Sequence, residues 1–307
     1  MDFQNLNITF RQLEIFVTVA RLGHVTNAGE ELGLTQAAVS LSLTALERQF
    51  HSPLFLRTGK RLILNDRGRL LLKKAEEVLR SVRMLVESMT STVDDPAGIL
   101  RVGASTTIGN YLLPALIGKF LRRYRRAKVE LMVGNTNQIE EQLASGYLDL
   151  GLIEGPSHRS NLINTDWRND ELVVVAAPRH PWTKKGCVTL RELEKASWLA
   201  REHGSGTREV FEEAIRTAGL KVEVKLELGH TEAIKQAAAA NLGVACLSRL
   251  AVTREISHGW LAEIKTPLNL QRKLLILQRQ DSLPTPLLNA MLTFIFKQKT
   301  RLSEASL

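Results

Sequence analysis

The sequence predicts an α/β fold preceded by a small, all-α-type winged helix-turn-helix. Three observations predict this architecture. Three apolar helical repeats fill most of the first 50 residues, and two short strand-like stretches follow them. Beyond Gly98 the chain alternates between strand-like and helix-like segments. That alternation is typical of a parallel α/β sheet.

The first two helical repeats are short and have polar starts. Thr9 and Thr26 are suitable N-caps for helices over residues 10–21 and 27–32, because a threonine hydroxyl can accept a hydrogen bond from a first-turn amide. A turn containing Gly33 then leads into a third helix. Two short helices joined by a tight, glycine-containing turn are typical of a helix-turn-helix.

The third helix, residues 35–50, has an apolar face and an uncharged face. Thr35 is its N-cap, and Val39, Leu43, Leu46 and Phe50 follow spacings of four, three and four residues. The opposite face carries Gln36, Ala37, Ser40, Leu41 and Thr44. In a DNA major groove, glutamine can pair with adenine, hydroxyls can donate or accept, and an apolar side chain can contact a thymine methyl. Taken alone, the stretch also fits an ordinary amphipathic surface helix.

Two apolar stretches on either side of Thr58 and Gly59 predict a β-hairpin. Its cations are Arg57, Lys60 and Arg61. Next to a helix-turn-helix, such a hairpin forms a wing whose cations can contact phosphates or a minor groove. The segments together favour a winged helix-turn-helix over a generic helical bundle.

A long amphipathic helix is predicted after the hairpin. Asn65 is its N-cap, and the Asp-Asp-Pro sequence at 94–96 ends it. Its apolar positions are Leu71, Ala75, Val78, Val82, Leu85 and Met89. Because so long a helix has too little local core to cover this stripe, we expect it to pack against a second subunit.

Length and charge fit a protein of several folding units with a polyanionic partner. The chain has 307 residues and a net charge of +9. Residues 1–93 hold twelve Lys and Arg against nine Asp and Glu, so much of the excess lies elsewhere, in residues 122–128. We interpret that cluster as a solvated helix end, where cations are favoured by the helix dipole.

The sequence predicts a cytoplasmic protein. It has no apolar stretch of membrane-spanning length and no signal peptide, so no membrane partner is expected. The two cysteines, Cys187 and Cys246, indicate a reducing compartment without structural disulfides. We interpret both as core or surface thiols.

Polar loops recur where predicted strands of the α/β region end and helices begin. We expect a loop over residues 105–110, followed by a helix to residue 124. The candidate anion ligands in these loops are Ser105, Thr106, Thr107, Asn135, Thr136, Gly204, Ser205, Gly206, Thr207, Arg208 and His230. Helix N-termini favour anions through their free amides and dipole, although each residue taken singly also fits a helix cap.

The N-terminal motifs resemble those of LysR-type transcriptional regulators. The residues that carry the resemblance are Phe10-Arg11-Gln12-Leu13, Phe16, Ala28, Leu32, Thr35-Gln36-Ala37-Ala38-Val39-Ser40, Leu46-Glu47, Leu54-Phe55 and Arg57. Leu41 departs from the pattern, because such regulators often carry a polar or cationic residue there.

The resemblance implies a DNA-binding regulator with a two-lobed, periplasmic-binding-protein-like effector domain. It implies four parts: a winged helix-turn-helix over 1–65, a dimerisation helix over 66–94, effector lobe 1 over 98–163 and 268–300, and lobe 2 over 164–267. The expected partners are a pseudo-palindromic operator in double-stranded DNA, a second subunit in a homodimer that pairs into a tetramer, and RNA polymerase. Neither a metal nor a cofactor is expected.

The effector is expected to be a small anion in the crevice between the lobes, at the carboxyl ends of the strands. Several runs are similar to the branch of the family that handles sulfur and sulfite: 105–111, 153–156, Arg208 and 245–249. That similarity suggests sulfite or a related oxyanion. Neighbouring branches answer to carboxylates or phosphorylated sugars.

Two other classes of protein are weighed against a regulator. An enzyme could use His180, His203 or His230 as a base, but no nucleophile elbow, metal-ligand spacing or phosphate loop accompanies them. A solute-binding protein of α/β class would share the lobed fold but would carry a signal peptide and no helix-turn-helix. Both alternatives are therefore disfavoured.

Overall fold

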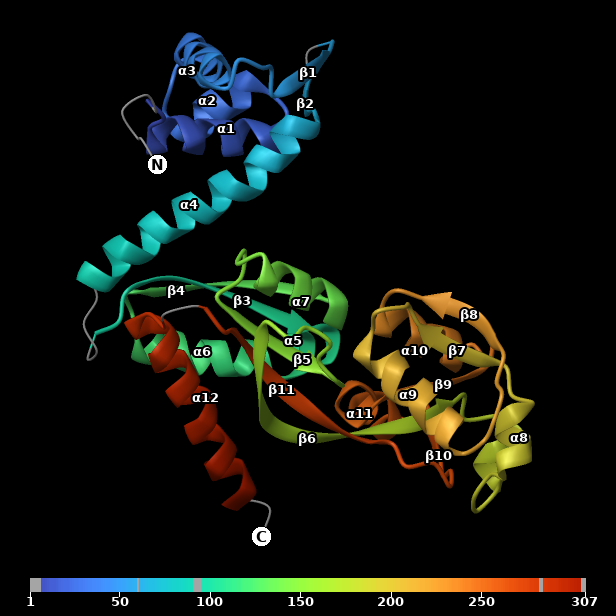
Figure 1. Ribbon diagram of the computed structural model, residues 1–307. Coiled ribbons are helices and arrows are strands. Elements are labelled where there is room, and N and C mark those ends of the chain that lie inside the picture. The colour runs from blue at the N-terminus through green and yellow to red at the C-terminus, as the bar shows by residue number, and fades with distance from the viewer. Residues whose placement is uncertain (1–6, 60, 91–94, 282–283, 305–307) are drawn as a thin grey trace. The chain divides into compact units, whose positions relative to one another are not determined.

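The computed structural model describes residues 7–59, 61–90, 95–281 and 284–304. The chain divides into two compact units, Met1–Thr90 and Ser91–Leu307 (Figure 1). Each unit has its own buried apolar core. No helix among the described residues is both long and apolar enough to cross a membrane.

The first unit consists of helices and one small sheet. Its elements are α1 (Phe10–Leu22), α2 (Val25–Leu32), α3 (Gln36–Gln49), β1 (Phe55–Thr58), β2 (Arg61–Leu64) and α4 (Asp66–Thr90). Two predicted caps are confirmed, since the hydroxyls of Thr9 and Thr35 accept hydrogen bonds from the amides of Gln12 and Ala38, both at 3.2 Å. The helix-turn-helix and its hairpin therefore form as the sequence predicts.

The predicted start of the second helix is wrong. The amide of Ala28 donates to the carbonyl of His24 at 3.1 Å, so α2 begins at Val25 and Thr26 lies inside its first turn. The turn that follows depends on glycine at position 29. A Cβ there would lie 2.7 Å from the carbonyl oxygen of Leu34, so only glycine lets α2 approach the start of α3 this closely.

The wing is attached to the helices by backbone and side-chain bonds. β1 and β2 are antiparallel, with Thr58 opposite Arg61. The amide of Leu62 donates to the carbonyl of Gly23 at 2.8 Å, and the amide of Leu54 donates to Glu47 Oε1 at 2.7 Å. These bonds fix the hairpin beside the end of α1 and the end of α3.

Helix α4 is capped by Asn65, whose Oδ1 accepts from the amide of Gly68 at 2.8 Å. Its first turns pack Ala75 into the core of the unit. Further along, α4 exposes Val78, Leu85, Val86 and Met89. These apolar side chains recur at helical spacing.

The second unit alternates strands and helices. Its elements are β3 (Gly98–Ser105), α5 (Thr106–Tyr111), α6 (Leu113–Arg123), β4 (Ala127–Gly134), α7 (Thr136–Ala144), β5 (Leu150–Glu154), β6 (Leu162–Ala176), η2 (Pro181–Lys184), α8 (Leu190–Glu194), β7 (Trp198–Arg201), α9 (Gly206–Thr217), β8 (Val224–Leu228), α10 (Thr231–Ala239), β9 (Val244–Ser248), α11 (Arg249–Ser257), β10 (Ala262–Ile264), β11 (Gln271–Arg279) and α12 (Pro286–Glu304). The strand order is β4-β3-β5-β11-β6-β9-β7-β8, with β10 on β6.

Each lobe is a sheet covered by helices on both faces. In lobe 1, helices α5, α6 and α12 lie on one face of the sheet and α7 lies on the other (Figure 1). Leu152, Leu274 and Ile276 pack with the first group, and Ile153 and Leu275 pack with α7. Neighbouring residues of a strand point to opposite faces, so one apolar strand serves both layers. In lobe 2, the side chains of β6 alternate between the two faces in the same way. Leu172 and Val174 pack with α9, and Val173 and Val175 pack with α10 and α11.

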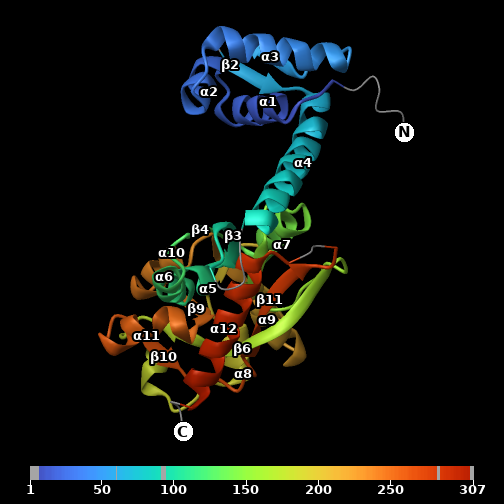
Figure 2. The same ribbon diagram turned by 90° about the vertical axis from the view of Figure 1, so that its left-hand side faces the viewer.

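The lobes are joined by two long strands that lie side by side, β6 and β11 (Figure 2). β6 pairs with β11 over residues 162–171 and with β9 over residues 172–175. β3, β4 and β5 are parallel, as are β7, β8 and β9, whereas the pairs that involve β6 or β11 are antiparallel. The predicted two-lobed α/β fold is therefore confirmed, with mixed pairing at the junction.

Candidate functional site

The uncharged face of α3 is accessible. Gln36, Ala37, Leu41 and Thr44 are exposed, and Ser40 is half-buried. Leu41 is the most exposed large apolar side chain of α3, with 70 % of its surface accessible. Val39, Leu43 and Leu46 hold the opposite face of the helix in the core. The spacing of these apolar residues therefore determines which face of α3 is exposed to solvent.

The wing presents two exposed arginines, Arg57 and Arg61, with no carboxylate partner among the described residues. Lys60, the third predicted wing cation, lies outside the described residues. Arg61 lies across the end of α1, and a Cβ at Gly23 would be 3.2 Å from its Nε. Both guanidiniums are therefore available to an external anion.

In the effector unit, the starts of α5 and α9 meet at the junction of the lobes. The predicted loop over 105–110 is wrong, because residues 106–111 form α5. Close packing explains the difference: a Cβ at Gly109 would lie 2.7 Å from a methyl carbon of Val133, so α5 lies directly on β4. Ser105 occupies the N-cap position of α5, and Ser205 occupies that of α9.

Hydrogen bonds and close backbone contacts hold the lobes together at this point. The amide of Gly206 donates to Thr136 Oγ1 at 3.2 Å, and Thr136 Oγ1 donates to the carbonyl of Glu154 at 3.1 Å. A Cβ at Gly206 would lie only 1.7 Å from that carbonyl oxygen. The amide of Asn137 also donates to the carbonyl of Gly204 at 3.2 Å. Lobe 1 and lobe 2 are therefore in direct backbone contact.

Arg201 connects the two lobes from the end of β7. Its Nη2 donates to Thr106 Oγ1 in lobe 1 and its Nη1 to Thr231 Oγ1 in lobe 2, both at 3.1 Å. Glu202 accepts from Arg201 and from Asn135. Burial alone would raise the pKa of Glu202, but the hydrogen bonds and charge of Arg201 outweigh burial and hold that pKa below its usual range. Glu202 is therefore ionised at neutral pH.

A buried ionic cluster lies between the starts of α5 and α9. Arg272 contacts Glu154 at 3.0 Å and Asp170 at 2.6 Å, and all three side chains are at most 2 % exposed. Arg272 also donates to Thr207 Oγ1 at 3.0 Å and to Thr107 Oγ1 at 3.4 Å. Two of the predicted effector hydroxyls are thus occupied by the protein itself.

The serine hydroxyls of the same two helix starts have no such partner. Ser105 Oγ and Ser205 Oγ are buried, and neither has a hydrogen-bond partner among the described residues. Neither hydroxyl caps its own helix. Buried hydroxyls without a partner are rare and costly. Two of them at the starts of α5 and α9 therefore make this junction a candidate ligand site.

The remaining predicted residues lie at the margin of this junction. His230 is exposed, and its side chain makes no capping bond to α10. Arg208 is buried and bonds Glu212, Glu227 and the carbonyl of Arg201. Its charge is therefore already balanced within lobe 2. The structure brings Ser105, Thr106, Thr107, Thr136 and residues 204–207 together, but not His230.

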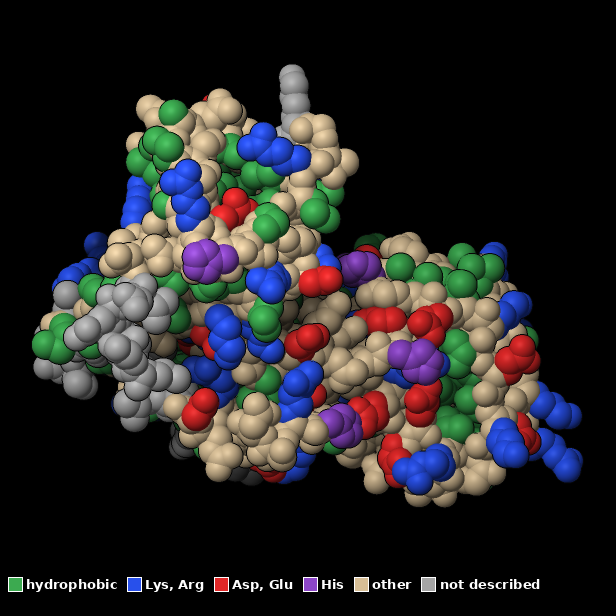
Figure 3. All heavy atoms as spheres, turned by 45° about the horizontal axis from the view of Figure 1, so that its top comes forward, with side chains coloured by type: hydrophobic (Ala, Val, Ile, Leu, Met, Phe, Trp, Pro, Cys, Tyr) green, Lys and Arg blue, Asp and Glu red, His purple; other side chains and the backbone are tan. Residues whose placement is uncertain are grey.

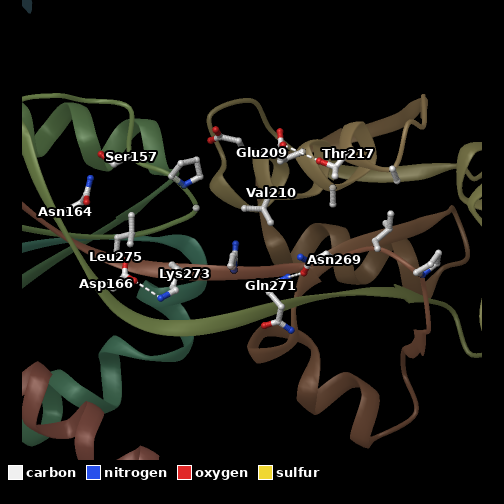
Figure 4. A pocket seen from close by; sticks show the side chains of 18 residues that line it. Ser157, Asn164, Asp166, Glu209, Val210, Thr217, Asn269, Gln271, Lys273 and Leu275 are labelled. Carbon is white, nitrogen blue, oxygen red and sulfur yellow. Dashed lines mark hydrogen bonds and ion pairs between the residues drawn. The ribbon is translucent and has the colours of Figure 1, made fainter.

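A cavity of about 940 Å³ lies behind the junction, on the strands that join the lobes (Figure 4). One wall is α9, with Glu209, Val210 and Thr217, and the floor includes Gln271 and Lys273 of β11. None of the predicted effector residues lines it. Its exposed charges are partly neutralised, since Lys273 pairs with Asp166 at 2.6 Å.

The thiols and acidic groups show no sign of metal or redox chemistry in the described part of the chain. No group of three or more His, Cys, Asp or Glu among these residues is placed to hold a metal ion. Cys187 is exposed and Cys246 is buried, and both are free thiols. Burial raises the pKa of the Cys246 thiol to about 12. That thiol therefore stays protonated and unreactive.

Sequence reasoning missed Arg201, Glu154, Asp170 and Arg272. A signal for Arg272 was present, because it falls in step with Leu274 and Ile276 on the buried face of β11. A charged residue at such a position needs a buried partner. The sequence alone does not say which strand supplies it.

Comparison with known proteins covers both units. The model of the bacterial regulatory helix-turn-helix protein of the lysR family matches residues 10–69, and the LysR substrate binding domain model matches residues 94–299. The uncharacterized HTH-type transcriptional regulator YeiE of Escherichia coli K12 is 42 % identical over 263 residues, which are 86 % of this chain and 88 % of that protein.

Two solved structures are also similar. CbnR complexed with its target DNA has a TM-score of 0.71 at 19 % identity, covering 95 % of this chain and 100 % of that one, and shows likeness of fold alone. The regulatory domain of Synechocystis CcmR, in complex with 2-PG, has a TM-score of 0.62 at 28 % identity, covering 66 % of this chain and 97 % of that domain.

Since the two family models match both units, the chain is a DNA-binding regulator with an effector-binding domain. The similar proteins are transcriptional regulators, so the chain is not an enzyme. The helix-turn-helix, the wing and the two-lobed α/β unit each correspond to a matched region. The chain belongs to the LysR family of bacterial transcriptional regulators.

Proposed function

We propose that the chain reads a pseudo-palindromic operator with α3 and changes its promoter binding when a small oxyanion binds between the effector lobes. Gln36, Ala37, Ser40, Leu41 and Thr44 contact bases, and Arg57, Lys60 and Arg61 contact phosphates. Exposure of Leu41 among polar side chains supports the face assignment, since an apolar side chain can meet a thymine methyl in the major groove.

Two substitutions separate base reading from phosphate binding. Gln36→Ala should cost about 1–3 kcal/mol of discrimination at one base pair if the amide makes a bidentate contact. Arg61→Ala should instead weaken binding to all sequences and reduce the salt slope by about 0.9 for each phosphate that is no longer neutralised. Titration of operator variants at several salt concentrations measures both effects.

The control for Gln36 is Gln49→Ala, which removes an exposed glutamine from the far end of the same helix. Thirteen residues separate the two positions, which turns Gln49 away from the proposed reading face. Operator preference that is unchanged in Gln36→Ala, or changed equally in Gln49→Ala, would refute the assignment.

The proposed assembly follows from the uncovered stripe on α4. The dimerisation helix is α4, Asp66–Thr90, and its predicted end at residue 94 lies outside the described residues. It stands in the chain between the winged helix-turn-helix of 1–65 and an effector domain of lobes 98–163 with 268–300 and 164–267. The exposed Val78, Leu85 and Met89 support a homodimer, since apolar side chains at helical spacing are stabilised by a partner helix. A pair of dimers, RNA polymerase as partner and a cytoplasmic location complete the proposal. Sedimentation equilibrium measures the assembly, and a monomer would contradict it.

The effector proposal rests on the two buried serine hydroxyls without partners, Ser105 Oγ and Ser205 Oγ. The guanidiniums near them are already balanced by carboxylates, Arg201 by Glu202 and Arg272 by Glu154 and Asp170. A ligand there is therefore recognised by neutral donors, hydroxyls and helix amides, which suits a small anion and not a bulky polyphosphate. Sulfite is one candidate. The likeness to CcmR, whose regulatory domain is in complex with 2-PG, supports a small-molecule effector.

A thermal-shift screen of sulfite, sulfate, phosphate and small carboxylates tests this proposal, because a ligand of the folded state raises the midpoint of unfolding. Calorimetry then compares wild type with Ser105→Ala and Ser205→Ala. Each variant should weaken binding of the active anion by about 1.5–3 kcal/mol, the range for hydrogen bonds to charged groups. Ser160→Ala, which removes an exposed hydroxyl of lobe 1, should bind as wild type does.

Operator affinity without the anion should stay unchanged in both serine variants, because the helix-turn-helix is a separate unit. If both variants bind the anion as wild type does, the effector does not lie between the serines. The cavity beside α9 then becomes the place to search (Figure 4).

A further inference from the structure

Positive charge is distributed unevenly between the two units. Met1–Thr90, which contains the helix-turn-helix, has twelve Lys and Arg against nine Asp and Glu, a net charge of +3. Ser91–Leu307 has 29 against 23, a net charge of +6. Five of those cations fall within residues 122–128, which contain no acidic residue. Apart from this segment, the effector unit is close to neutral.

These five cations are Arg122, Arg123, Arg125, Arg126 and Lys128, here called the arginine patch. All five are exposed. Arg122 and Arg123 occupy the last turn of α6, where the helix dipole favours cations. Arg125 and Arg126 follow the helix, in the turn before β4, and the dipole does not account for them. The expectation of a solvated helix end therefore covers only part of the patch.

Few carboxylates compensate the patch. Arg126 pairs with Asp95 at 3.0 Å, and Lys128 lies 3.5 Å from Glu130. Three cations remain without a carboxylate partner among the described residues: Arg122, Arg123 and Arg125. On the face of lobe 2 at the right of Figure 3, by contrast, acidic and basic side chains are intermingled. The patch is therefore a local excess of charge.

We propose that the arginine patch binds phosphates of DNA outside the base pairs that α3 reads. Four of its five cations are arginines, whose planar forks match phosphate oxygens better than ammonium groups do. The protein is a DNA-binding regulator, so the polyanion that such a patch fits is already its partner. Such contacts add affinity and orientation but carry no base specificity.

The test uses the full-length protein and an operator selected from random duplexes. That operator is placed in a duplex of about 20 base pairs, enough for two half-sites one turn apart, and in one of about 60 base pairs. The variant combines Arg122→Gln, Arg123→Gln and Arg125→Gln. A matched control combines Lys184→Gln, Arg191→Gln and Lys195→Gln, which removes three exposed lobe 2 cations outside any ion pair of the described residues.

On the long duplex, the arginine variant should lower the salt slope of binding by about 0.9 for each phosphate that the patch no longer neutralises, so by up to about 3 per subunit. On the short duplex it should bind as wild type does, and the control should match wild type on both. A triple Arg→Lys variant should restore part of the slope, since charge returns without the fork geometry.

Wild-type slopes for the arginine variant on both duplexes would overturn the proposal. So would a loss of transcription with purified RNA polymerase in the arginine variant alone, if its DNA binding is unchanged. That result would assign the patch to an acidic protein surface. Thermal unfolding of each variant checks that these surface substitutions leave the fold intact.

Discussion

Replacing Arg272 with Met is expected to lower the free energy of unfolding of the effector unit by about 3–5 kcal/mol, because removal of one partner leaves buried charges uncompensated. Glu154 and Asp170, each 2 % exposed, would keep their negative charges with no cation beside them. Thr107 and Thr207 would also lose the donor that now bonds their hydroxyls. Denaturant unfolding of the purified protein measures the loss.

Two further variants identify the cause. Lys273→Gln removes the next cation along β11, but its pair with Asp166 is more than half exposed, so the loss should be at most about 1 kcal/mol. A triple variant with Arg272→Met, Glu154→Gln and Asp170→Asn should recover much of the stability, because no unpaired charge remains buried. Equal losses in the single and triple variants would show that packing, and not charge, is responsible.

Gly206→Ala is expected to prevent the two lobes from meeting as they do here. Its Cβ would lie 1.7 Å from the backbone carbonyl oxygen of Glu154, which cannot give way cheaply, and 2.8 Å from the side-chain oxygen Oγ1 of Thr136. The start of α9 must withdraw from β5, which breaks the 3.2 Å bond from the Gly206 amide to Thr136. Overpacking of this kind typically costs about 1–3 kcal/mol, and occasionally more.

For Gly206→Ala we therefore expect both lower stability and loss of the effector response, with operator binding retained. The control is Gly229→Ala, since a Cβ at Gly229 meets nothing within 4 Å. Its stability should stay within about 0.5 kcal/mol of wild type. A Gly206→Ala protein that unfolds like wild type and still responds to the effector would show that this contact is dispensable.

Apolar periodicity predicted the helices of the helix-turn-helix unit well, because residues close together in the sequence determine each helix. Val39, Leu43 and Leu46 mark the buried side of α3 by spacing alone, and Thr35 marks its start. The predicted start of α2 was wrong because His24 and Thr26 are both possible N-cap positions. The backbone bond from Ala28 to His24 starts the helix two residues earlier than a cap at Thr26 would. Helix α5 was missed because packing of Gly109 on Val133, across 24 residues of sequence, stabilises a segment of weak helix formers.

The ionic cluster shows where sequence reasoning stops. Alternation alone places Arg272 on a buried face, and Asp170 is in step with Leu172 and Val174 in the same way. The register of strand pairing cannot be read from the sequence. Arg272 lies directly opposite Asp170 because β6 pairs with β11, although the two residues are 102 positions apart in the chain. That register also decides that Thr107 and Thr207 bond an arginine, whereas Ser105 Oγ and Ser205 Oγ have no hydrogen-bond partner among the described residues.

The pairing of β6 with β11 has a mechanical consequence. The lobes are joined through β6 and β11, two strands bonded to one another within a single sheet. Pulling the lobes apart along this ribbon would have to lengthen two backbones that are already extended, whereas twisting the ribbon keeps the hydrogen bonds between its strands. Two-stranded ribbons tolerate large twist, and the register shift at Leu274/Leu275 is a place where extra twist concentrates. The junction is thus stiff to stretching and soft to torsion.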